Sequence, residues 1–154
     1  MTTRPAVEKA YEKHAWIVFF VFGLLAVIAA PIMLLGKPPN PPSAEGMTGL
    51  TLDQMATRMP GVIGYIGGIS RQLGNFILVM GVLTMSLAAV PYRKGEKWAW
   101  YISWIFPVLL GIQLANSFAT GGFLWQLDFA FVFVILAGLF MSYRKFFPKE
   151  RVTP

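Results

Sequence analysis

Four long apolar segments, separated by short polar ones, dominate the pattern along the chain. They cover about residues 15–36, 71–91, 98–118 and 123–143. A helix of about 20 apolar residues spans the hydrocarbon core of a bilayer. The pattern therefore predicts an all-α polytopic membrane protein, in which the whole chain forms one bundle of four transmembrane helices.

The largest polar stretch, residues 37–70, is expected to be a loop outside the membrane. Its first part, KPPNPPSAEG, is too rich in proline and glycine for regular structure. Thr51 and Gln54 match a capping box, and Pro60 with Gly61 stops the helix that begins there. We therefore expect one short extracytoplasmic helix over about 52–58, lying on the membrane surface or over the bundle, with a substrate lid as the alternative.

Prolines mark three places along the crossings. Pro31 predicts a kink near the outer end of the first crossing, and Pro91 predicts the end of the second. Pro107, in the middle of the third, lacks the N–H that would bond the carbonyl of Ser103. Neighbouring groups must satisfy that carbonyl inside a membrane.

Basic residues are distributed unevenly between the two sides of the predicted membrane. Ten of the 13 Lys and Arg residues fall on the side of the termini and the hairpin after the second crossing. Cytoplasmic loops carry such an excess, so both termini are predicted to face the cytoplasm. The ten are Arg4, Lys9, Lys13, Arg93, Lys94, Lys97, Arg144, Lys145, Lys149 and Arg151; the other three are Lys37, Arg58 and Arg71.

Composition supports the membrane assignment and excludes several chemistries. The chain is 56% hydrophobic and only 13% charged. Its net charge of +6 comes from residues at the ends of apolar segments, so we expect membrane lipid and not nucleic acid as partner. Cysteine is absent and His14 is the only histidine, so we predict no metal, no cofactor and no catalytic residue of the usual histidine or cysteine types.

Small residues recur every seven positions in and before the second crossing. Gly67, Gly74, Gly81 and Ala88 form this small-residue seam. Small residues on one face let a neighbouring helix approach closely, and a seven-residue period favours a left-handed crossing. The partner is expected to be a helix of the same bundle, with a helix of another subunit as the alternative.

Polar side chains gather at the predicted outer ends of three crossings. We expect Arg71 to pair with Asp128, because an unpaired carboxylate inside hydrocarbon is costly. This outer polar cluster either ties three helices together or forms a ligand or catalytic site. Its members are Arg71, Gln72, Asn75, Gln113, Asn116, Gln126 and Asp128.

Three of these features together support a resemblance to known proteins. The amphipathic segment ending at Pro60, the Arg-x-x-Gly at Arg71 to Gly74 and the sequence PYRKGEKWAWY at 91–101 resemble small, uncharacterised four-crossing membrane proteins of bacteria and archaea. The general plan is also similar to DoxX-like proteins. The resemblance implies the same four-helix fold and supplies no catalytic residue.

Two functions are compatible with these patterns. The first is an accessory or structural subunit of a larger membrane complex in the cytoplasmic membrane, associating with other integral subunits or with itself. The alternative is a protein or enzyme that binds a lipid, isoprenoid or quinone through the outer polar cluster. A channel or transporter would need an oligomer and ranks third.

Overall fold

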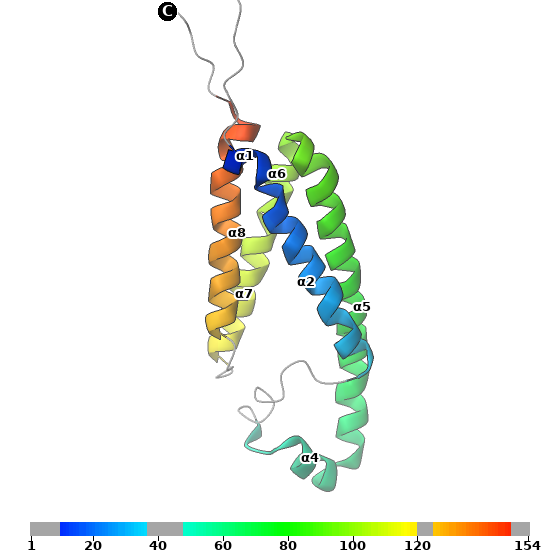
Figure 1. Ribbon diagram of the computed structural model, residues 1–154. Coiled ribbons are helices and arrows are strands. Elements are labelled where there is room, and N and C mark those ends of the chain that lie inside the picture. The colour runs from blue at the N-terminus through cyan, green and yellow to red at the C-terminus, as the bar shows by residue number, and fades with distance from the viewer. Residues whose placement is uncertain (1–9, 37–47, 120–124, 149–154) are drawn as a thin grey trace, which may run out of the picture.

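The computed structural model of the protein describes residues 10–36, 48–119 and 125–148, and every regular element in these ranges is helical (Figure 1). The predicted all-α fold is confirmed for these parts of the chain. The elements are α1 (Ala10–His14), α2 (Trp16–Leu34), α4 (Leu52–Arg58), α5 (Pro60–Leu87), the π-helical turn η1 (Ala88–Tyr92), α6 (Lys97–Ser103), α7 (Ile105–Ala119) and α8 (Trp125–Phe146).

Four helical segments are long and apolar enough to cross a membrane. They are Ala10–Leu34, Pro60–Tyr92, Lys97–Ala119 and Trp125–Phe146. In the most apolar window of each, only 17 to 22% of the residues are buried inside the protein. Most of the apolar surface of these helices therefore needs a further apolar environment, which a bilayer supplies.

The second long helix starts earlier than the sequence indicated. Residues 60–70, predicted as part of the outer loop, are the first turns of α5. Pro60 does follow the end of α4, yet it also occupies the first turn of α5, where the missing N–H has no intrahelical partner in any case. Only Met59 therefore lies between the end of α4 and the start of α5 at Pro60.

Pro91 does not end the helix abruptly. The chain continues through it as η1, whose wider turn accommodates the missing N–H. The backbone then reverses at Gly95, which has a φ of +78° that favours glycine. Amide groups of Gly95 and Glu96 close this reversal by donating to the carbonyls of Tyr92 and Pro91.

The third span is interrupted just before Pro107, where only a lost hydrogen bond was predicted. The helix breaks at Trp104, between α6 and α7, within the four residues that precede the proline. The buried Ser103 hydroxyl donates to the carbonyl of Ala99 across 2.7 Å. Trp100 and Ser103, on α6, are both buried.

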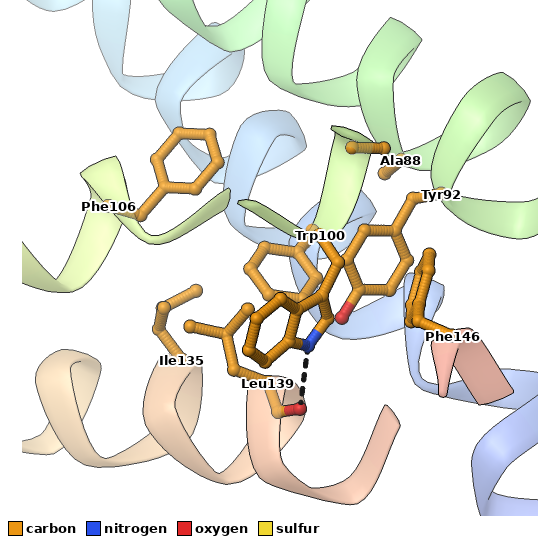
Figure 2. Close-up of a cluster of buried hydrophobic side chains, with 9 residues drawn as sticks. Ala88, Tyr92, Trp100, Phe106, Ile135, Leu139 and Phe146 are labelled. Carbon is orange, nitrogen blue, oxygen red and sulfur yellow. Dashed lines mark hydrogen bonds between the residues drawn. The ribbon is translucent and has the colours of Figure 1, made fainter. Parts of the chain in front are cut away.

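Aromatic and apolar side chains from α2, η1, α6, α7 and α8 form one buried core near the hairpin (Figure 2). Tyr92 lies between Phe19 and Phe146, with ring centroids 4.8 Å from each. Figure 2 also shows the indole N–H of Trp100 directed at the carbonyl of Leu139, at 3.2 Å. These contacts join both ends of the chain to the hairpin.

The long helices are arranged as two pairs that meet at this core. α2 packs along α5, α7 packs along α8, and α2 also contacts α8. The pairs lie close together near α1 and α6 and diverge toward the opposite end, where α5 projects past α2 and carries α4 (Figure 1). The bundle is thus closed at the hairpin end and open between α5 and α7.

Candidate functional site

The outer polar cluster is divided between the two helix pairs. Arg71, Gln72 and Asn75 lie on α5, Gln113 and Asn116 on α7, and Gln126 and Asp128 on α8. Six of the seven side chains are exposed, and Asp128 is half-buried. The structure therefore does not bring the seven residues into one enclosed polar site.

Arg71 lies over the turn that follows α2. A Cβ atom at Gly36 would be 3.2 Å from Nε of Arg71, so the guanidinium group rests against this glycine. Gly36 has a φ of +76° and donates its N–H to the carbonyl of Met33. A cation at this position is favourable, because the last carbonyls of a helix carry partial negative charge.

Asp128 is held by α7 and by its own helix. The hydroxyl of Ser117 donates to Oδ2 of Asp128 across 2.5 Å. Within the described residues α8 begins at Trp125, and Asp128 lies in its first turn. The positive end of the α8 dipole stabilises a carboxylate there. The predicted start of this crossing at residue 123 lies outside the described residues.

The predicted ion pair between Arg71 and Asp128 is not formed within the described residues. Each side chain instead serves its own helix pair, and the two pairs diverge at this end of the molecule (Figure 1). Sequence alone indicated that both residues lie at outer ends of helices. It carried no information on the divergence that separates them.

The small-residue seam has its partner inside the same chain. Its members are all buried, and the seam faces α2. A Cβ atom at Gly74 would lie 2.9 Å from the backbone N of Leu34, and one at Gly81 would lie 2.8 Å from the carbonyl oxygen of Gly23. Backbone-to-backbone packing at these distances requires glycine on α5.

Gly23 on α2 is the reciprocal residue that the sequence analysis missed. A Cβ atom there would lie 2.8 Å from the carbonyl oxygen of Gly81, so the two glycines face each other. An isolated glycine in an otherwise apolar crossing is the sequence feature that marks it. Ser70 extends the same contact, because its hydroxyl donates to the carbonyl of Met33 at 3.4 Å.

A second buried polar contact was also missed. The hydroxyl groups of Tyr92 and Ser142 are 2.5 Å apart, and Ser142 is 2.9 Å from the carbonyl of Leu139. Both side chains are fully enclosed in the core. Nothing in the sequence links Tyr92 with Ser142, which lie 50 positions apart. Each is, however, a polar side chain in a largely apolar stretch, and such a group needs a hydrogen-bond partner when it is buried.

The part of the chain that the structure describes contains no cluster of side chains suited to bind a metal ion. No group of three or more His, Cys, Asp or Glu side chains comes together there. Nδ1 of His14 lies 2.7 Å from the carbonyl of Ala10, one turn earlier in α1. His14 therefore has a local partner at the start of the first span.

Comparisons with known proteins do not assign this chain to a family. No family model, curated protein or solved structure matches it. Its function is therefore argued from the placement of its own residues.

Proposed function

We propose that the protein is an accessory or structural subunit of a larger integral membrane complex and performs no chemistry of its own. The observation that carries this proposal is the position of Gln113. Its side chain is exposed on α7, and it makes no hydrogen bond with any described residue. Gln113 lies six residues before the end of the span at Ala119, about 9 Å along the helix.

An amide that faces lipid at this depth is unfavourable, because hydrocarbon offers it no hydrogen-bond partner. A helix of another subunit supplies such a partner, and contacts of this kind contribute about 0.6 to 2 kcal/mol in membranes. Leu109 and Ile112 are exposed on α7 as well, so such a helix could pack along this part of α7. An integral membrane partner thus explains a side chain that the chain itself leaves exposed.

The arrangement gives less support to the alternative, a protein or enzyme for a lipid, isoprenoid or quinone with its polar site in the outer leaflet. Such a site needs convergent polar groups in a pocket. Arg71 and Asp128 instead belong to different helix pairs, and the amides around them are exposed.

The proposed location is the cytoplasmic membrane, with the hairpin and both termini in the cytoplasm and α4 outside. The excess of Lys and Arg at the termini and hairpin supports this orientation. The length of the second span also supports an external α4, since 33 residues reach about 50 Å and exceed a hydrocarbon core of about 30 Å. The proposed partners are membrane lipid and other integral subunits or further copies of the chain, not nucleic acid.

Purification from native membranes in a mild detergent tests the subunit proposal. We expect defined integral membrane proteins to co-migrate with the wild-type chain, and Gln113→Leu to reduce their recovery while the variant itself stays folded. Ile112→Leu is the matched control, because Ile112 is the adjacent exposed residue on α7 and has no amide. A single small species for the wild type, or equal recovery with both variants, contradicts the proposal.

A further inference from the structure

The open side between α5 and the α6–α7 segment contains an apolar groove of about 580 Å³. Met80, Leu83 and Leu87 line it on α5, and Ile102, Ile105 and Phe106 line the opposite wall. This volume is within the range of about 300 to 1,000 Å³ that small-molecule sites occupy. The groove is therefore large enough to hold a small-molecule ligand.

The two hydroxyl groups in the α5 wall are already satisfied. Thr84 donates to the carbonyl of Met80 at 2.7 Å, and Ser86 donates to the carbonyl of Val82 at 2.9 Å. These two hydroxyl groups therefore add no free hydrogen-bond donor to a lining that is mostly hydrocarbon. An occupant that is itself a hydrocarbon chain suits this lining.

The lining differs near the hairpin, where it includes Glu96 and Trp98. The indole N–H of Trp98 donates to Oε2 of Glu96 across 2.6 Å. Glu96 lies between the span that ends at Tyr92 and the one that begins at Lys97, which places it in the headgroup layer. A carboxylate accepts several hydrogen bonds, so the half-buried Glu96 retains acceptor capacity.

We propose that this groove binds one acyl chain of a phospholipid whose headgroup carries a primary amine, with the ammonium group on Glu96. Burial of the acyl chain alone gives little selectivity, because the surrounding lipid is equally apolar. Selectivity must then come from the headgroup. The exposed Lys94, two residues before Glu96, supplies positive charge near the lipid phosphate.

Glu96 also decides between headgroup classes. A carboxylate attracts an ammonium group that donates hydrogen bonds and disfavours a headgroup with only negative charge. A choline headgroup is cationic but has no N–H to donate. The groove should therefore select phosphatidylethanolamine over both phosphatidylcholine and phosphatidylglycerol.

Native mass spectrometry of the full chain, released from bilayers containing these three lipids in equal amounts, tests the headgroup. We expect retained lipid on the wild-type protein to be enriched in phosphatidylethanolamine. Glu96→Gln should lower that enrichment about tenfold, since the neutral amide keeps the shape of the side chain but loses the charge that strengthens a hydrogen bond from an ammonium group. Equal retention of the three lipids, or an unchanged preference in Glu96→Gln, overturns the proposal.

The groove itself is tested by a bulky side chain placed in its wall. Leu83→Trp should abolish lipid retention, whereas Val82→Trp should preserve it, because Val82 is an equally exposed neighbour on α5 that does not line the groove. Retention by Leu83→Trp at the wild-type level overturns the assignment to this groove. A lipid-free dimer in the wild-type spectrum overturns it too, since a second copy of the chain would then occupy the groove. These measurements are independent of the subunit proposal, which concerns Gln113 on α7.

Discussion

At the scale of single residues, the close packing of α2 against α5 depends on the absence of a Cβ atom in glycine. Gly23 and Gly81 face each other, and each would place a Cβ atom 2.8 Å from the carbonyl oxygen of the other. No side chain fits at such a distance without moving backbone. A membrane offers no hydrophobic driving force between helices, so close van der Waals contact is a main source of their association.

Gly81→Leu should therefore separate α2 from α5 and destabilise the protein by about 1 to 3 kcal/mol, the usual range for overpacking. Val82→Leu should have little effect, because Val82 is half exposed beside the seam. Thermal unfolding in detergent compares the two variants. Equal midpoints would mean that the seven-residue spacing does not determine the packing of α5.

The seven-residue spacing was visible in the sequence because it is a local repeat, and the same is true of the capping box at Thr51. In the structure the hydroxyl oxygen of Thr51 accepts a hydrogen bond from the backbone N–H of Gln54. The side-chain oxygen of Gln54 in turn accepts one from the backbone N–H of Thr51. The Tyr92 to Ser142 contact could not be predicted in this way. It depends on how distant helices cross, which no local pattern specifies.

At the scale of helices, apolar lengths predicted that four long helices exist, whereas their bounds and their arrangement were predicted less well. The presence of four long apolar helices follows from local composition, and the break at Trp104 lies within the four residues before Pro107. The start of α5 at Pro60 was missed because a proline that ends one helix also suits the first turn of the next. Divergence of the two helix pairs was missed because an outer polar residue on each helix suggested a common site.

This divergence gives a test at the level of the helix pairs. Arg71→Gln should loosen the end of α2, and Asp128→Asn should weaken the contact with Ser117 on α7. Since the two sites share no partner, the double variant should lose the sum of the two single effects to within about 0.5 kcal/mol. Unfolding free energies of the four proteins in one detergent give the coupling. A double variant clearly milder than that sum would show that the two charges interact.

At the scale of the whole molecule, the protein has one closed end and one open end. The core around Tyr92 and Trp100 joins every long helical segment near the hairpin, whereas at the other end α5 extends past α2 and contacts α4, with Tyr65 70% exposed. The proposed lipid groove lies beside the hairpin, between α5 and the α6–α7 segment, and the proposed partner contact at Gln113 lies farther along α7. The core near the hairpin thus holds the helices together while most of their apolar residues stay exposed.

The orientation of this molecule in the membrane is the last prediction, and the absence of cysteine makes it simple to test. A single cysteine at Thr57, exposed on α4, should react with an impermeant thiol reagent in intact cells. A single cysteine at Thr153, which lies outside the described residues, should react only after the membrane is opened. The physical reason is the excess of Lys and Arg around the hairpin and termini, which holds that side in the cytoplasm during insertion. The opposite labelling pattern would place α4 in the cytoplasm and contradict the proposed topology.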